Sequence, residues 1–132
     1  MDYLAAPYST GLDPRLSEKD RAEVVFNRFY QITQAAAYLT ERGHFVYSPV
    51  THCAAIASHA PMDHAFWMRH CMTMLRNCST LYLLTLPGWD SSDGVADEIA
   101  ETKGRGKPIF LLRPGNWTVA RLDQYERGEV TL

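Results

Sequence analysis

Short apolar segments that alternate with longer amphipathic ones are the feature that most constrains the fold of this chain. The short segments are bounded by Pro or Gly and are typical of buried strands: residues 3–6, 44–48, 81–86 and 108–112. Between the first two, residues 18–42 place apolar side chains such as Phe26 and Ile32 mostly at three- and four-residue steps, which predicts a long helix ending at Gly43. Strand, helix and strand form a βαβ unit, so we expect a parallel pair with a right-handed crossover.

Further helices are expected between the later strands. Ser17 is a plausible N-cap for the first helix, and Asp63 is a good N-cap for a helix that runs to about Asn77. The remaining expected elements are a short helix over 51–57, a loop over 58–62, a helix over 95–103 and a last short helix over 119–127. Four strands that alternate with helices predict one domain, residues 1–132, with the three-layer α/β architecture of doubly wound folds.

Composition and charge exclude several classes of function. Hydrophobic residues make up 46% of the 132 residues, charged residues make up 21%, and the formal net charge is −2. This is the composition of a globular protein without the basic surface that binding to a nucleic-acid polymer requires. No apolar run approaches the ~20 residues of a membrane helix, and the N-terminus does not resemble a signal peptide. We therefore expect a cytoplasmic protein with reduced cysteines and no membrane partner.

The polar stretch over residues 88–99 is the strongest candidate for a functional site. It follows a strand and leads into a helix, and ligands bind at such carboxyl ends of strands in open α/β sheets. Ser92 and Asp93 can cap the helix, while Gly94 lets a ligand approach the backbone closely. Glu98 lies one turn further on, where the positive end of the helix dipole favours its ionised form. This carboxylate is the main candidate for chemistry.

The loop after the first strand shares this sheet edge if that strand is central. Tyr8 could stack on an aromatic base, and Ser9 could bond a phosphate or a sugar hydroxyl. The alternative for Tyr8 is that its ring only packs over the end of the sheet. We expect Pro7, Tyr8 and Ser9 to face residues 90–98 across one crevice.

A purely structural interpretation of the polar stretch is also open, and the residues alone favour it. Asp93 and Asp97 would then cap the helix and complement its dipole. Glu98 would be exposed beside an apolar stripe formed by Val95, Ala96 and Ile99.

Four motifs in order resemble the nucleoside 2-deoxyribosyltransferase-like superfamily. Residues 3–9 (YLAAPYS) are similar to its opening strand and loop, and residues 43–49 (GHFVYSP) are similar to its second strand. Residues 86–98 combine LPGW with SDGVADE, and residues 106–109 read GKPI. The LPGW variant is closest to a small branch known as a domain of unknown function. The resemblance covers roughly residues 3–112.

This resemblance implies both a fold and a chemistry. The fold is flavodoxin-like, with a mainly parallel four- to five-stranded sheet, assembled as a homo-oligomer such as a dimer or tetramer. The chemistry is cleavage or transfer of an N-glycosidic bond in a nucleoside or nucleotide, without a cofactor. Glu98 would attack the anomeric carbon, and Asp93 would bind the sugar hydroxyls or protonate the departing base. The substrate-binding residues expected around them are Pro7, Tyr8, Ser9, His52, Trp67, Cys71, Trp89, Asp90, Ser92 and Gly94.

Two positions depart from the family pattern. Family members usually carry Asp where this chain has Cys71, and often carry Asp where it has Ser79. The first of those Asp residues commonly takes part in substrate binding and acid–base chemistry. A second interpretation is therefore a catalytically impaired module of the same fold that binds a nucleotide or an ADP-ribose-like ligand.

The histidines and cysteines between residues 52 and 71 do not form a metal-binding pattern. Their spacings match neither HExxH nor paired CxxC, so no metal site is expected. His52 follows the second strand and is better placed in the crevice, and Trp89 either roofs the crevice or makes a packing contact. A thiolate–imidazole pair between His70 and Cys71 is disfavoured, because adjacent helical side chains point about 100° apart.

Overall fold

The computed structural model describes residues 1–9 and 12–132, which have an α/β fold. Its strands are β1 (Asp2–Ala5), β2 (Val46–Tyr47), β3 (Thr80–Leu84), β4 (Ile109–Leu112) and β5 (Val119–Arg121). Its helices are α1 (Glu18–Glu41), α2 (Pro49–His59), α3 (His64–Arg76), α4 (Asp93–Gly104) and α5 (Leu122–Glu126), with a 3-10 turn, η1 (Trp89–Ser91), before α4.

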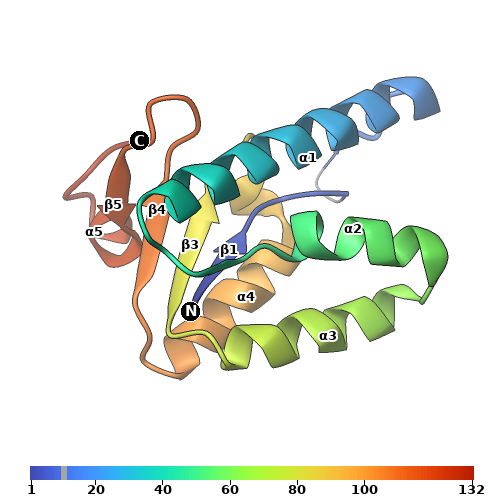
Figure 1. Cartoon of the computed structure of the whole chain (residues 1–132). Helices are drawn as coiled ribbons and strands as arrows, with labels where there is room; N and C mark the ends of the chain where they lie inside the picture. Colours follow the sequence, from blue (N-terminus) through green and yellow to red (C-terminus); the bar gives the residue numbers. More distant parts are fainter. Residues whose placement is uncertain (10–11) are drawn as a thin grey trace.

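The strands form one sheet in the order β2-β1-β3-β4-β5. β1 pairs in parallel with both β2 and β3, β3 pairs in parallel with β4, and β5 runs antiparallel to β4. Helix α1 covers one face of this sheet, while α3 and α4 lie against the other (Figure 1). This confirms the expected three-layer, flavodoxin-like architecture with a mainly parallel sheet.

Helix α1 begins and ends where its sequence predicts. Ser17 is the N-cap and accepts a hydrogen bond from the Asp20 backbone at 3.1 Å, and Gly43 has a φ of 87° just beyond the helix end. The first half of the helix projects past the sheet (Figure 1), which leaves Phe26 68% exposed. The core-facing residues are Arg28, Ile32, Ala35, Ala36 and Leu39, so the apolar periodicity of the first half does not face the sheet.

Two segments differ from the sequence-based expectation. Helix α2 begins at Pro49 and continues to His59, so the expected loop over 58–62 starts too early. Ser48 caps this helix by accepting from the Thr51 backbone, and proline is well suited to a first helical turn. The second difference is at residues 119–127, where a strand precedes a five-residue helix. The turn around Gly115, with a φ of 89°, returns the chain so that residues 119–121 pair with β4.

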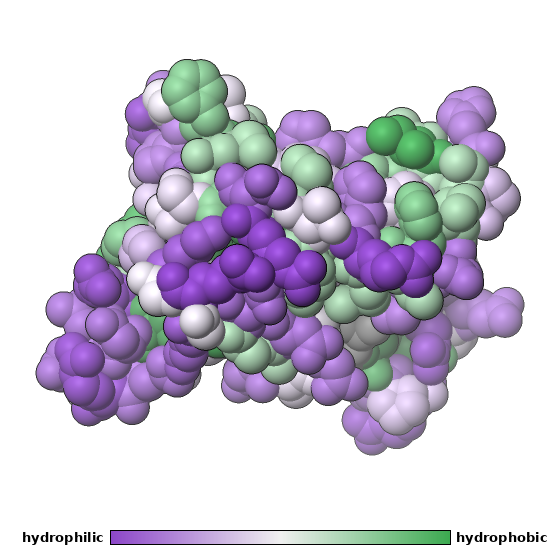
Figure 2. Space-filling model, turned by 90° about the horizontal axis from the view of Figure 1, so that it is seen from below, coloured by the Kyte–Doolittle hydropathy of each residue, from purple (hydrophilic) through white to green (hydrophobic). Residues whose placement is uncertain are grey.

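The two faces of the sheet carry separate cores because successive strand residues point to opposite sides. Leu4 of β1 packs with α1, whereas Tyr3 and Ala5 pack with the helices on the other face. Seen from the α3 side, the surface is mainly hydrophilic, with hydrophobic residues in separate patches (Figure 2). Within the described residues, no helix has both the length and the apolar character to cross a membrane.

Candidate functional site

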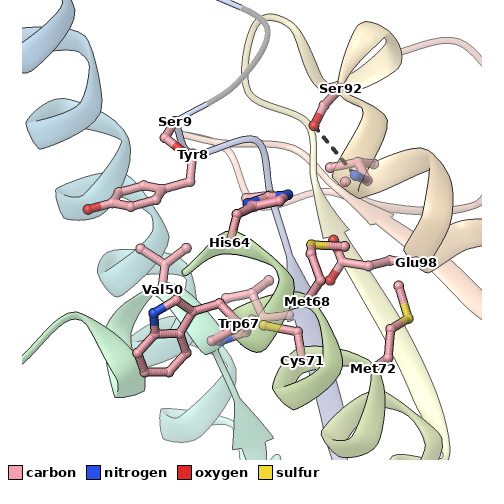
Figure 3. A pocket seen from close by; sticks show the side chains of 15 residues that line it. Tyr8, Ser9, Val50, His64, Trp67, Met68, Cys71, Met72, Ser92 and Glu98 are labelled. Atoms are coloured by element: carbon pink, nitrogen blue, oxygen red, sulfur yellow. Dashed lines mark hydrogen bonds between the residues drawn. The ribbon is translucent and has the colours of Figure 1, made fainter. Parts of the chain in front are cut away.

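A crevice opens at the carboxyl edge of the sheet, where the loops after β1 and β3 lie next to each other. Its walls come from the loop after β1, the start of α2, one face of α3 and the first half of α4 (Figure 3). The inner lobe, of about 180 Å³, is lined by Leu4, Ala6, Tyr8, Ser9, Pro49, Val50, His64, Trp67, Met68, Cys71, Met72, Ser92, Gly94, Val95 and Glu98. An adjoining lobe of about 260 Å³ shares several of these residues and adds Cys53, Ala54 and Ala57.

Seven of the residues proposed from sequence lie together in this crevice. They come from three separate parts of the chain: Tyr8, Ser9, Trp67, Cys71, Ser92, Gly94 and Glu98. The loop after β1 therefore faces the start of α4, as the parallel pairing of β1 and β3 leads one to expect.

Five other proposed residues lie outside the crevice lining. Asp93 is exposed as the first residue of α4, and Pro7 is buried in the loop after β1. His52 is exposed, bonds the Ser48 carbonyl at 2.9 Å and stacks on the Tyr47 ring at 5.3 Å. Trp89 and Asp90 line a different hollow, where the Trp89 ring packs 5.7 Å from that of Tyr125.

Glu98 is buried in the middle of the core-facing stripe of α4. The buried positions of this helix are Val95, Glu98 and Thr102, while Ala96 is exposed. The exposed Glu98 of the purely structural interpretation is therefore wrong, because its side chain is only 9% accessible. In Figure 3 it extends from α4 toward Met68 of α3. The apolar pattern of α4 places Glu98 beside the core-facing stripe, but α3 packs against this side of the helix and buries it.

Burial governs the ionisation of Glu98. Loss of hydration raises its pKa from 4.5 to about 7, the Tyr3 hydroxyl lowers the pKa, and the nearby Asp97 charge raises it. The expectation that the helix dipole would favour the ionised form is thus reversed by desolvation. A carboxyl group with this pKa changes charge near neutral pH, as catalytic acids and bases do.

Two further polar groups lie near the Glu98 carboxyl, the buried Tyr3 hydroxyl and the half-buried Cys71 thiol. Burial raises the pKa of the Cys71 thiol to about 11, and burial together with the Glu98 charge raises the pKa of Tyr3. The Tyr3 hydroxyl lacks a partner at full hydrogen-bond geometry in the described part of the chain, although Glu98 and Cys71 are close enough to affect its ionisation. This group can adjust toward the carboxylate when the charge of Glu98 changes.

Arg28 is a site-building residue that the sequence analysis did not identify. It is buried on α1, and its guanidinium donates to the Tyr8 carbonyl at 2.9 Å and to the Pro87 carbonyl at 3.1 Å. Burial lowers the pKa of this group. The side chain thereby ties together the loops that follow β1 and β3. A charged residue one turn before Ile32, on the core face of an amphipathic helix, is the signal that could have revealed it.

Helix α3 supplies more of the crevice lining than any other helix. His64, Trp67, Met68, Cys71 and Met72 follow three- and four-residue steps along one face of the helix. Asp63 caps this helix by accepting from the Phe66 backbone at 2.8 Å, as expected. The helix was predicted correctly, but His64 and the two methionines were not assigned to the site. Among the residues described, no three His, Cys, Asp or Glu side chains are grouped to hold a metal ion.

Comparison with known families places the chain in one of them. A family model described as a domain of unknown function (DUF1937) matches residues 1–113. The chain belongs to this family. The matched region contains β1 to β4 and every residue of the crevice lining, whereas β5 and α5 lie beyond it. No curated protein matches the sequence.

Proposed function

We propose that the crevice binds a nucleoside or nucleotide and that Glu98 attacks its anomeric carbon, so that the N-glycosidic bond is cleaved or transferred. The observation that carries this proposal is the buried carboxyl of Glu98, which lines a cavity at the carboxyl edge of the sheet. The resemblance of residues 3–9 and 86–98 to the nucleoside 2-deoxyribosyltransferase-like superfamily supports the choice of substrate.

The chemistry follows from a carboxylate held against the sugar. A Glu98 oxygen forms a bond to the anomeric carbon while the bond from that carbon to the base nitrogen breaks, through an oxocarbenium-like state. The base leaves with a proton. Water then opens the glycosyl ester in a hydrolase, or the nitrogen of a second base does so in a transferase.

The ionisation of Glu98 sets the pH dependence of this step. With a pKa of about 7, the carboxyl is mostly protonated below pH 6 and mostly ionised above pH 8. Only the ionised form is nucleophilic, so the rate of the first step should rise with pH through about 7. Single-turnover rates between pH 5 and pH 9 measure this midpoint directly.

The proton for the leaving base has two candidate sources. Asp93 is the one that the family resemblance implies, but its exposed side chain is outside the crevice lining. His64 lines both lobes, and we assign it this role because imidazole is the commonest general acid in enzymes. Asp93→Asn and His64→Gln separate the two: His64→Gln should slow the release of poor leaving groups more than Asp93→Asn.

The decisive experiment is a base-release assay. Purified protein is incubated with a panel of 2′-deoxynucleosides and their 5′-monophosphates, and free base is separated by chromatography. Glu98→Gln should lower base release by about a thousandfold or more. Asp97→Asn is the matched control, because Asp97 is the exposed neighbour of Glu98 on the same helix. Equal release by wild type and Glu98→Gln would rule out the nucleophile.

A second candidate function is a binding module without turnover. The observation that favours it is Cys71, whose thiol pKa of about 11 makes it a much weaker acid than the Asp of the family pattern. This candidate predicts that nucleotides or ADP-ribose raise the melting temperature of both wild type and Glu98→Gln. It also predicts that no base is released from any member of the panel.

The assembly and location implied by the resemblance belong to the same proposal. We propose a cytoplasmic homo-oligomer, and the exposed Phe26 and Tyr30 side chains on the projecting half of α1 support self-association. Sedimentation of wild type and of Phe26→Asp at matched concentrations tests this. A monomeric wild type would contradict it.

A further inference from the structure

The outer lobe of the crevice is lined by a cysteine that is absent from the inner lobe. Cys53 of α2 lines this lobe together with Cys71, at a distance in sequence from Glu98 and on a different helix. The Cys53 thiol, which the inner lobe lacks, contacts Tyr47 and His70, so the chemistry available here differs from that of the inner lobe. The proposed glycosidic chemistry uses neither Cys53 nor the two groups that contact its thiol, Tyr47 and His70.

Three polar atoms from three elements meet at Cys53. Its Sγ lies 3.2 Å from the Tyr47 hydroxyl of β2 and 4.0 Å from His70 Nδ1 of α3, and the Tyr47 hydroxyl lies 3.4 Å from the same nitrogen. The imidazole is held by aromatic neighbours, with the Trp67 ring 5.6 Å away at an interplanar angle of 71°. The thiol can thus pass its proton to the imidazole directly or through the phenol hydroxyl.

The three cysteines of the chain have different surroundings. Cys53 has an imidazole within reach and faces the outer lobe. Cys71 also faces the crevice, but burial raises the pKa of its thiol to about 11 and the Glu98 charge raises it as well, which together outweigh the lowering by the Tyr3 hydroxyl. Cys78 is 2% exposed and its carbonyl, not its thiol, is bonded by Lys107. Thiolate reactivity depends on a nearby base and on access, and Cys53 has both.

We infer that Cys53, with His70 as its base, is a nucleophilic thiol that reacts with small uncharged hydroperoxides entering the outer lobe. The size follows from the exposure of Cys53, which is only 8% and comes through the lobe. The lack of charge follows from the lobe lining, which is mostly apolar: Pro49, Val50, Ala54, Ala57 and Trp67. Transfer of an ion into such surroundings is costly.

The step is a two-electron oxidation of sulfur. The Cys53 thiol gives its proton to His70, and the thiolate attacks one peroxide oxygen, so that an S–O bond forms and the O–O bond breaks. The leaving oxygen takes the proton back from the imidazolium and departs as water or an alcohol. The sulfur becomes a sulfenic acid, and the peroxide is the species reduced.

The test is the order in which the three thiols are oxidised in the folded chain. The protein is treated with limiting hydrogen peroxide in the presence of dimedone, which traps sulfenic acid, and the adducts are located by mass spectrometry. The Cys71→Ser variant is run in parallel, so that no sulfenic acid is lost to a disulfide with the second thiol of the lobe. Cys53 should be labelled at least about tenfold faster than Cys78.

The role of His70 is tested with two histidine variants. His70→Gln should slow labelling of Cys53 about tenfold, since an unassisted thiol is only a few per cent ionised at pH 7. His59→Gln, at the exposed end of α2, should leave the rate unchanged. The Cys78 signal reports on folding in every variant, because this thiol becomes reactive only if the core opens.

Two outcomes would overturn the inference. One is labelling of Cys71 or Cys78 ahead of Cys53 in the wild-type protein, a measurement that needs no variant. The other is an unchanged Cys53 rate in folded His70→Gln. Neither outcome depends on base release, so the result is independent of the function proposed for Glu98.

Discussion

The two faces of the sheet have different interiors although the same strands supply both. On the α1 face the buried cluster consists of aliphatic and alanine side chains: Leu4, Ile32, Ala35, Ala36, Leu39, Leu84, Leu86 and Leu112. On the opposite face the buried cluster is also mainly aliphatic, but it includes Tyr3, Tyr47, Cys53 and Cys78. The buried carboxyl of Glu98 lies beside it. The adjacent residues Tyr3 and Leu4 of β1 therefore pack in the cores on opposite faces of the sheet.

The polar groups buried on the crevice face are suited to chemistry but lower the stability of the fold. Burial of aliphatic side chains is favourable in proportion to their area, whereas a buried carboxyl or hydroxyl loses hydration that neighbouring groups restore only in part. Aliphatic burial on both faces should accordingly contribute to the folding free energy, while the crevice face also contains groups, chiefly Glu98, that lower it. Four substitutions examine this division, beginning with the one expected to have the largest effect.

The first is Leu84→Ala, on the α1 face. Leu84 is fully buried, and removing such a side chain from a packed core costs about 2–5 kcal/mol of unfolding free energy. Urea denaturation measures the loss. Ile56→Ala is the control, because Ile56 is 56% exposed on α2 and should change stability by less than about 0.5 kcal/mol. A similar small cost for both substitutions would show that the aliphatic cluster on the α1 face contributes little to stability.

The second is Glu98→Gln, on the crevice face, where the expected sign is opposite. Between its unfolded pKa near 4.5 and its folded pKa of about 7, the folded state binds more protons than the unfolded state, so stability falls as pH rises. The raised pKa corresponds to a loss of about 3 kcal/mol of unfolding free energy. The full loss applies above pH 7, and there is none below pH 4.5.

Removing the ionisable group should remove this loss. Glu98→Gln should therefore be more stable than wild type at pH 8.5, by up to about 3 kcal/mol, with no such gain at pH 4. Urea denaturation at both pH values gives the two differences. Asp97→Asn, on the exposed side of α4, should show no comparable pH dependence. Parallel stability curves for wild type and Glu98→Gln would contradict the burial of an ionisable carboxyl.

The third is Arg28→Met. Arg28 is a charged side chain that is buried on the otherwise apolar α1 face. Arg28 is a buried cation that bonds the Tyr8 and Pro87 carbonyls, and methionine retains much of its length without the donors. Loss of these charge-assisted bonds should cost about 2 kcal/mol. It should also weaken ligand binding, because the Tyr8 loop forms one wall of the crevice. Arg42→Met, at the exposed end of α1, is the control for loss of charge. If both variants bind alike, the two carbonyls do not need Arg28.

Sequence periodicity predicted the fold well because it records which residues face the core. The strands, the long helix and the cap at Asp63 all followed from local patterns of apolar residues, proline and capping side chains. The helix predicted over 119–127 is present over 122–126 but was wrong at 119–121, because pairing with β4 decides the conformation of these three residues.

The site was less predictable because it depends on how elements pack. Glu98 is buried because α3 packs over a side of α4 whose sequence is polar. Gly88, with a φ of 93°, begins the turn that places Trp89 and Asp90 in a separate hollow. The contact between Cys53 and His70 joins two helices across 17 residues, and no local spacing rule covers such a pair.

The fourth substitution, Tyr47→Phe, has the smallest expected effect and separates packing from hydrogen bonding on the crevice face. The ring stays in the core, while the hydroxyl that lies 3.2 Å from Cys53 Sγ and 3.4 Å from His70 Nδ1 is lost. One buried hydrogen bond of this kind is worth about 1 kcal/mol. Tyr30→Phe, an exposed tyrosine on α1, should change nothing measurable by urea denaturation. Equal stability of the two variants would mean that Cys53 and His70 satisfy each other without the phenol, and the crevice face would then differ from the α1 face chiefly through Glu98.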